Sequence, residues 1–342
     1  MLRYVIRRLL VMVPTLVAAS ALIFLIVELP PGDYLSNEMA ELRARGEAAS
    51  AARLEFLRAE HDLDKPLIER YAIWVGVWPG AKGFSGLLQG DWGWSFAYQK
   101  PVSAVLGDTM MLTLLLNAAT VLFIYLVAFP IGVYSATRQY SLGDYGFTLI
   151  GYLGIAVPNF LAALVLLYLA NRWFGVSIGG LMAPEYLNAP WSWAKFGSVL
   201  AHLIVPVVVI GSAGTAAMIR RLRANLLDEL RKPYVRAARA RGLGETQLLV
   251  KYPLRMALNP FISDIGNLLP SLVSGSVIVS VVLNLPTVGG VLIDALKAQD
   301  QFLAAFILMF VSVLTIVGML VSDLALAALD PRVRHAATEP RA

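Results

Sequence analysis

The chain has 342 residues, of which 58% are hydrophobic and only 15% are charged, and it contains no cysteine. This composition excludes an ordinary water-soluble domain, and the lack of cysteine excludes disulfides, thiolate catalysis and Cys-based metal sites. The net charge of +5 requires no nucleic-acid partner, because membrane proteins keep an excess of Lys and Arg on their cytoplasmic side. The histidines His61, His202 and His335 lack the spacing of metal ligands, so we expect no metal and no other cofactor.

Six apolar stretches follow one another along the chain, and each is free of Lys, Arg, Asp and Glu. They cover residues 9–27, 109–137, 145–171, 196–219, 265–293 and 301–322. A hydrocarbon layer of about 30 Å takes roughly 20 helical residues, and in lipid a segment that is not part of a closed barrel must be helical to satisfy its backbone. The pattern predicts an all-α polytopic membrane protein with six transmembrane helices.

The first stretch has a feature in common with a secretory signal, because Arg3, Arg7 and Arg8 precede an apolar run. Its 19 uncharged residues exceed the usual signal core, and Glu28, Leu29 and two prolines follow it in place of a small-residue cleavage site. We therefore expect an uncleaved first membrane helix, with residues 1–29 forming a cytoplasmic arm and this helix.

The segment 30–108 is the large polar part between the first two helices. Within it, residues 37–62 interleave leucines with Glu and Arg, which predicts two helical pieces that break at Gly46. The second half carries four tryptophans among glycines, namely Trp74, Trp78, Trp92 and Trp94. This composition favours a segment lying at headgroup depth over an aromatic platform for a substrate.

The distribution of Lys and Arg predicts the orientation. Ten of the 28 Lys and Arg residues lie between Arg220 and Arg255, on the same side as the N-terminal arginines, whereas the two short loops of the opposite side hold only Arg172, Lys195 and Lys297. The excess of cations marks the cytoplasmic side. We expect both termini in the cytoplasm, segment 30–108 outside it, a core of residues 109–330 with a cytoplasmic loop at 220–262, and a cytoplasmic tail at 331–342.

The cytoplasmic loop has its own pattern. The fourth stretch reaches Ile219 without a charge and then meets Arg220, Arg221 and Arg223, which would together cost roughly 8 to 10 kcal/mol at membrane depth. The lipid boundary is therefore expected near Met218. Leucines then keep helical spacing up to Pro233, after which residues 234–241 predict a short basic helix that Gly242 ends in a left-handed conformation.

These residues resemble the permease subunits of ATP-binding-cassette (ABC) importers, in particular the branch that carries peptides and nickel. The cytoplasmic signature of that family reads EAA, three residues, G and an apolar run. Here Arg236, Ala237, Ala238 and Gly242 take those places, with Arg236 in place of the glutamate, as in that branch. Five further matches lie in order along the chain: RYVIRRLL at residues 3–10, LPPGDY at residues 29–34, GDWGWSF at residues 90–96, AVPNFLAALVLLYL at residues 156–169, and DPRVR at residues 330–334.

The resemblance implies a type I ABC importer permease fold with an extracytoplasmic insertion after the first helix. It implies that the chain is not an enzyme but a permease subunit of an inner membrane, which forms half of a path for peptides or similar small solutes. The implied partners are a second, non-identical permease subunit, cytoplasmic ATPase subunits that hydrolyse ATP, and an extracytoplasmic solute-binding protein. The sequence agrees, because it lacks the GxxxxGK[S/T] loop that binds nucleotide phosphates.

The implied ATPase-coupling helix and the residues after it comprise Tyr234, Arg236, Ala237, Ala238, Arg239, Ala240, Arg241, Gly242, Leu243 and Gly244. Candidate contacts along the path are Asn117, Asn159, Ser271 and Ser274, although hydrogen bonds between packed helices explain most such residues. Positive-inside topology and attraction to anionic lipid are the alternative explanation of the basic loop.

Two alternatives concern the function as a whole. The same mechanism would serve an importer of oligosaccharides or opines, since the permease path is often less selective than the binding protein. A secondary transporter would be expected to carry ionisable residues at mid-membrane and inverted repeats, and the sequence has neither.

Overall fold

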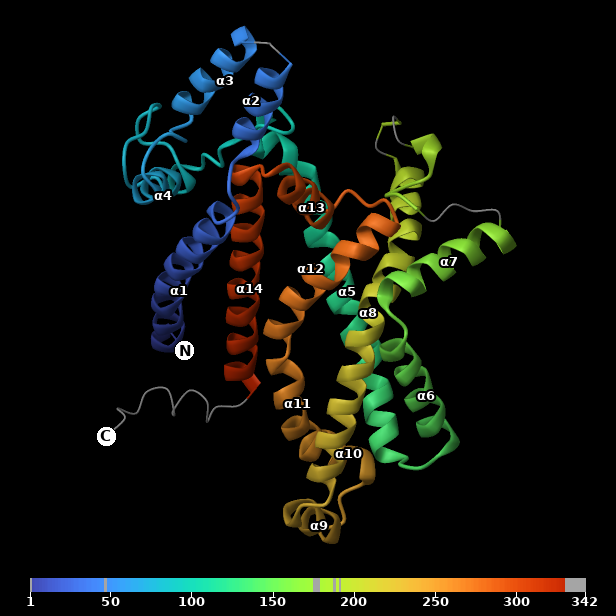
Figure 1. Cartoon of the computed structure of the whole chain (residues 1–342). Coiled ribbons are helices and arrows are strands. Elements are labelled where there is room, and N and C mark those ends of the chain that lie inside the picture. Colours follow the sequence, from blue (N-terminus) through green and yellow to red (C-terminus); the bar gives the residue numbers. More distant parts are fainter. Residues whose placement is uncertain (1, 46–47, 175–178, 187–188, 191, 330–342) are drawn as a thin grey trace. The chain divides into compact units, whose positions relative to one another are not determined.

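The structure is a computed structural model that describes residues 2–45, 48–174, 179–186, 189–190 and 192–329. The first part of the chain contains α1 (Leu2–Glu28), α2 (Tyr34–Ala44), α3 (Ala48–Glu60), α4 (Leu67–Val75), the 3-10 turn η1 (Leu87–Gln89), and the antiparallel strands β1 (Trp94–Ser95) and β2 (Lys100–Pro101). Next come α5 (Val102–Thr137), α6 (Leu142–Ala156), α7 (Asn159–Phe174), η2 (Pro184–Tyr186) and α8 (Trp193–Leu230). The last part contains α9 (Pro233–Ala240), α10 (Glu245–Lys251), α11 (Pro253–Ser263), α12 (Ile265–Val282), α13 (Val288–Ala298) and α14 (Gln301–Leu329) (Figure 1).

Four of these helices are long and apolar enough to cross a membrane, within the residues that the structure describes. They are α1, α5, α8 and α14, and the bent pair of α6 and α7 is a fifth candidate. The predicted stretches 9–27, 109–137, 196–219 and 301–322 lie inside the four single helices. The predicted polytopic, helical membrane protein is therefore confirmed.

The prediction of one continuous helix over residues 145–171 is wrong. The chain forms α6 and α7 instead, and their axes differ by 103°. The break lies at Val157, whose φ of −89° and ψ of 121° are extended, and Pro158 follows it. A proline ring disfavours helical conformation in the residue before it, which explains the position of the bend.

The predicted stretch 265–293 is also broken. Helix α12 ends at Val282 and α13 begins at Val288, with Asn284 in a left-handed conformation at φ 51°. Pro286 cannot donate a backbone hydrogen bond, and asparagine tolerates positive φ better than most residues. Together they stop the helix before the apolar sequence stops.

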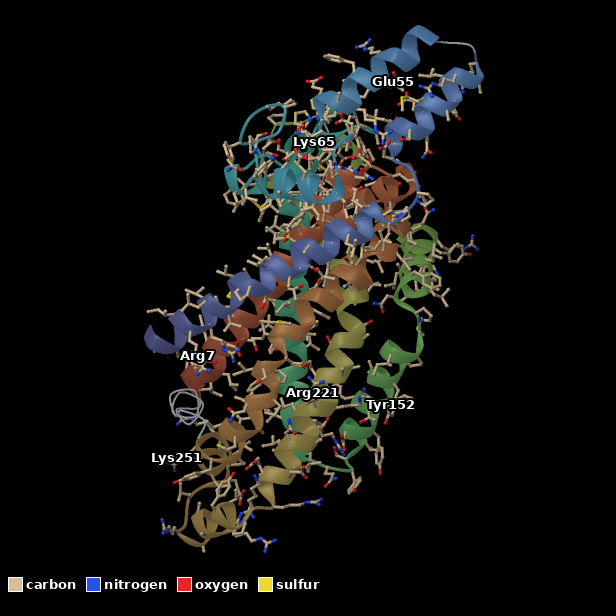
Figure 2. The ribbon with its side chains drawn as sticks, turned by 60° about the vertical axis from the view of Figure 1, so that its left-hand side comes forward. Arg7, Glu55, Lys65, Tyr152, Arg221 and Lys251 are labelled. Atoms are coloured by element: carbon tan, nitrogen blue, oxygen red, sulfur yellow. The ribbon has the colours of Figure 1, made fainter. Side chains whose placement is uncertain are left out.

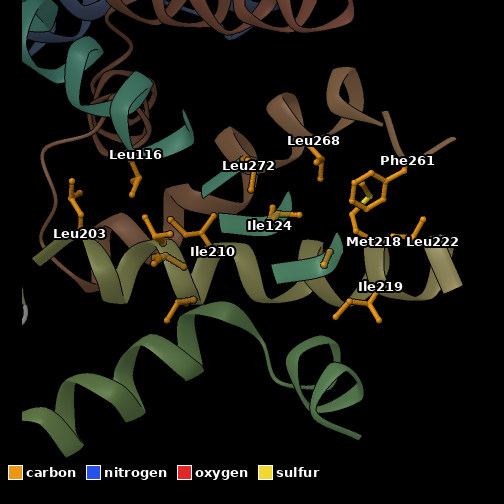
Figure 3. Packing of buried hydrophobic residues seen from close by; sticks show 14 of the residues in the cluster. Leu116, Ile124, Leu203, Ile210, Met218, Ile219, Leu222, Phe261, Leu268 and Leu272 are labelled. Atoms are coloured by element: carbon orange, nitrogen blue, oxygen red, sulfur yellow. The ribbon is translucent and has the colours of Figure 1, made fainter. Parts of the chain in front are cut away.

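The contacts divide the chain into two compact units, each described by itself. Unit 1 comprises residues 1–12, 112–289 and 314–342. Its core is formed by α5, α8, α11 and α12, and Figure 3 shows Leu116, Ile124, Ile210, Met218 and Phe261 among the buried side chains. At Gly214 of α8 an added Cβ would lie 2.8 Å from Ile124 of α5, so this small residue permits the close approach of the two helices.

Unit 2 comprises residues 13–111 and 290–313. Helices α2 and α3 form the two predicted helical pieces of the outer segment and enclose a small core of Leu35, Met39 and Leu54 together with Phe96. Trp74 departs from the expected interfacial position, because it is buried, with its ring 5.6 Å from that of Phe24. Tertiary packing inside unit 2 therefore replaces lipid contact at this tryptophan.

The GDWGWSF segment packs against the beginning of α14. The Trp92 ring stacks on Phe306 at 4.2 Å, and the buried Asp300 carboxylate accepts hydrogen bonds from Ser95 Oγ at 2.6 Å and from the Ala97 N–H at 3.1 Å. Burial raises the pKa of Asp300, and these donors act in the opposite direction by stabilising its charged form. Gly93 has φ 86°, and an added Cβ would lie 2.9 Å from Cδ1 of Phe302.

Replacing Gly93 with alanine is predicted to destabilise unit 2. The left-handed conformation costs a side chain about 1 kcal/mol, and the clash with Phe302 adds roughly 1 to 3 kcal/mol. Gly90→Ala is the matched control, because Gly90 has φ 80° but no atom within 4 Å of the added Cβ. Thermal unfolding of the purified full chain should show a clearly larger loss for Gly93→Ala, and equal losses would contradict the packing described here.

Candidate functional site

Helix α8 connects the apolar core of unit 1 with the basic loop 220–262. Its 38 residues span about 57 Å at 1.5 Å per residue, against a hydrocarbon thickness of about 30 Å. The helix therefore continues well past Ile219, as the leucine spacing predicted, and ends at Leu230 (Figure 1).

Two ion pairs hold the part of α8 that follows the apolar stretch. Arg223 donates Nε and Nη2 to the two carboxylate oxygens of Asp144 at 3.0 and 2.8 Å, and the Asp144 side chain is almost fully buried. Arg221, labelled in Figure 2, pairs with Asp264 at the junction of α11 and α12. Bidentate arginine–carboxylate pairs fix orientation as well as distance, so α8 is braced by α6 on one side and by the α11–α12 junction on another.

Helix α9 follows directly after α8 and forms as the sequence predicted. Pro233 is its first residue, where a missing N–H costs nothing and the proline φ suits a helix. Gly242 has φ 81°, and its N–H donates to the Arg239 carbonyl at 3.0 Å. The predicted left-handed end of the helix at Gly242 is confirmed.

A separate small core lies beneath α9. It is formed by Val235, Ala238 and Leu248, with Leu243 and Tyr252 packed around it. Val235 and Leu248 have no exposed surface. The spacing of Val235 and Ala238 by three residues places both on one helix face, so that α9 and α10 form a compact cap of their own.

The remaining face of α9 is exposed. Tyr234, Arg236, Ala237 and Arg241 reach solvent, whereas Ala238 points into the small core. Ala238, one of the residues of the implied coupling helix, is therefore not part of the exposed face. Arg236 and Arg241 form no ion pair within the described residues, so no described carboxylate neutralises these two charges.

Two residues of α9 are instead engaged within the loop. Arg239 donates to both carboxylate oxygens of Glu245 at 2.8 and 3.0 Å, and this hydrogen bonding raises the pKa of Arg239. The Tyr234 hydroxyl donates to Glu229, and burial, with this hydrogen bond as the second cause, raises the pKa of Tyr234. Both groups keep their protons at neutral pH, so the Tyr234 hydroxyl is neutral and the Arg239 charge is paired with Glu245.

The candidate path residues lie on three different helices. Asn117 of α5 is buried, with its Nδ2 lacking a partner among the described residues, and Asn159 is the first residue of α7. Ser271 and Ser274 belong to α12, but their side chains lie outside the described part of the structure. The structure brings none of the described candidates together as a polar site. In the described part of the chain, no cluster of three His, Asp or Glu could hold a metal.

Sequence reasoning missed the acidic partners of the loop. Glu229, Glu245, Asp144 and Asp264 each pair with a basic residue of the segment 220–262. Glu229 and Glu245 flank the basic helix closely enough to be found from sequence spacing. Asp144 lies 79 residues before its partner, so only the fold connects the two.

Comparison with known proteins agrees with this arrangement. Residues 128–335 match the family described as "Binding-protein-dependent transport system inner membrane component", and residues 1–117 match the N-terminal region of the same kind of membrane component. The chain is 32% identical over 339 residues to the oligopeptide transport system permease protein AppB of Bacillus subtilis, covering 98% of this chain and 100% of that protein.

Two further relatives show similar coverage. A putative peptide permease protein of Brucella ovis is 31% identical over 342 residues, covering 98% of this chain and 99% of the relative. The glutathione transport system permease protein GsiC of Escherichia coli K12 is 32% identical over 336 residues, covering 98% of this chain and 100% of the relative. With matches of this extent along both halves, the chain belongs to the family of binding-protein-dependent transport system inner membrane components, the non-enzymatic permease subunits of ABC importers.

Proposed function

We propose that this permease couples to its ATPase through α9 and moves peptides or similar small solutes. The observation that carries the proposal is the exposed cationic face of α9, which is held on its own core at the end of the braced helix α8. Family membership supplies the partner classes, namely ATPase subunits, a solute-binding protein and a second permease.

The proposed arrangement in the membrane has six spans. Helices α1, α5, α8 and α14 account for four, the bent pair of α6 and α7 for a fifth, and α12 with its 18 residues for the sixth. The excess of Lys and Arg in the 220–262 loop supports cytoplasmic termini, with segment 30–108 on the outer side.

The proposed coupling is mechanical. An ATPase groove would receive the face of Tyr234, Arg236, Ala237 and Arg241, and the small residues Ala240, Gly242 and Gly244 would allow close approach. Leu243 and Ala238 support this face from below. Motion of α9 would reach the membrane through α8, because the pairs of Arg221 and Arg223 tie α8 to neighbouring helices.

The substrate class is supported by the relatives. Two of them are named as peptide permeases and a third as a glutathione permease, and glutathione is itself a small peptide. An importer of oligosaccharides or opines is the alternative. A secondary transporter is disfavoured, because the six predicted spans contain no Lys, Arg, Asp or Glu.

Charge reversal on the exposed face tests the coupling. Arg236→Glu and Arg241→Glu should each lower ATP-driven solute uptake roughly tenfold or more, since a reversed charge at a docked face costs binding energy. Arg231→Glu is the matched control, because Arg231 is exposed in the same loop but precedes α9. Uptake and copurification of the ATPase would be measured in the assembled importer.

The control variant Arg231→Glu distinguishes docking through α9 from attraction to anionic lipid as the explanation of the basic loop. If Arg231→Glu lowered uptake as much as Arg236→Glu, general attraction to anionic lipid would explain the charge, and docking through α9 would be rejected. Membrane insertion should be equal in all three variants.

Cysteine labelling tests the orientation, because the chain has no native cysteine. Ala40→Cys on α2 and Thr246→Cys on α10 are both exposed positions. In intact spheroplasts a membrane-impermeant maleimide should label Ala40→Cys, and it should label Thr246→Cys only after permeabilisation. The opposite labelling pattern would overturn the topology and the coupling proposal with it.

A further inference from the structure

A cavity of about 350 Å³ lies within unit 2 and includes no residue of the cytoplasmic loop. Ligand pockets range from about 300 to 1,000 Å³, so this cavity is at the small end of the range. Its volume suits a molecule with a single ring or a short branched chain, and it is too small for an extended oligopeptide.

The walls of the cavity are rich in aromatic rings. Phe24, Trp74, Trp94 and Phe302 line it, and they come from four segments of the chain that are distant in sequence. The faces of such rings carry negative electrostatic potential and attract organic cations, with tryptophan the most effective. The lining therefore offers both apolar contact and a preference for positive charge.

Charged side chains at the cavity strengthen this preference. Four carboxylates line it, against the two cations Arg70 and Lys82. The Arg70 guanidinium already donates hydrogen bonds to the Glu28 carboxylate at 2.5 Å and to the Gln301 side chain at 3.0 Å. Asp62 is neutralised by Lys65 at 3.0 Å, a residue outside the lining. The cavity retains a net negative charge after these pairs are counted.

The remaining carboxylates are Glu60 and Asp91. Glu60 has only a long ion pair, 3.8 Å to Lys82, whose side chain is half exposed. Asp91 accepts the Gly93 N–H at 2.9 Å and pairs with no cation in the described part of the chain. These two groups have acceptor capacity left for a positively charged ligand.

His61 does not oppose a cation. Its ring packs against Phe96 at 5.1 Å and against Trp94 and Phe302 at 6.3 Å. Burial, with Lys82 as the second cause, lowers the pKa of His61, so the imidazole is neutral at pH 7. A neutral imidazole adds hydrogen-bonding capacity without repulsion.

We propose that this cavity binds a small organic cation whose charged nitrogen is attached to an aromatic or branched aliphatic body. The body would lie between Trp74, Trp94 and Phe302, and the nitrogen would face Glu60 and Asp91. The site is independent of the α9 coupling face and of the transported solute.

Phenylethylamine and phenylethanol are suitable probes, because they share a body and differ in charge. Titration of the full chain in lipid nanodiscs, followed by tryptophan fluorescence and calorimetry, should show roughly tenfold tighter binding of the amine. The double variant Glu60→Gln, Asp91→Asn should bind the two probes equally and keep the affinity for phenylethanol, which shows that the cavity is still folded.

The control variant Glu41→Gln, Asp64→Asn removes the same charge from exposed positions outside the lining. It should keep the preference for the amine. Equal binding of both probes to the unmodified chain, no binding of either, or the same loss in the control variant would overturn the proposal. Because no ATPase takes part, such a result leaves the importer proposal untouched.

Discussion

The cost of placing charge in lipid is the constraint on which the rest of this structure depends. Helix α8 contains no Lys, Arg, Asp or Glu between Phe196 and Ile219, and its first arginines follow directly after this apolar stretch. The structure pairs Arg221 with Asp264 and Arg223 with Asp144, a nearly buried carboxylate. The charges that end the membrane span thus also hold the helix that leads to α9.

In the cap formed by α9 and α10, some residues of the short basic motif hold the loop together and others form its exposed surface. Val235 and Ala238 point inward onto Leu248, so part of the motif is required by the loop's own folding. Arg239 is bound to Glu245 across the turn at Gly242. The outward-facing residues are Tyr234, whose hydroxyl donates to Glu229, the exposed alanines, and two arginines that form no ion pair with any residue the structure describes. A rigid cationic surface is presented without the loss of side-chain and backbone entropy that a flexible loop would suffer on binding.

The apolar stretches predicted the positions of long apolar helices, because a charge-free run that lies in lipid must be helical to satisfy its backbone. They did not predict the bends, because the hydrophobic pattern of a stretch is the same whether its helix is straight or broken. Pro158 and Pro286 mark both breaks, yet prolines also occur inside α5 and α8 without breaking them. The difference depends on tertiary contacts that can satisfy the freed carbonyls. Burial of Trp74 and the pairing of Asp144 with Arg223 likewise depend on contacts between distant segments.

The two glycines of the motif have different physical explanations. Gly242 adopts φ 81°, so the backbone alone favours glycine there, whatever binds nearby. Gly244 has φ −62°, a value open to any residue, and no neighbouring atom of the described residues lies within 4 Å of an added Cβ. Gly244 is the N-cap of α10 with an extended backbone, a position at which glycine is favoured, so the start of this helix accounts for it. Both glycines thus follow from the way in which one helix ends and the next begins, independently of any partner protein.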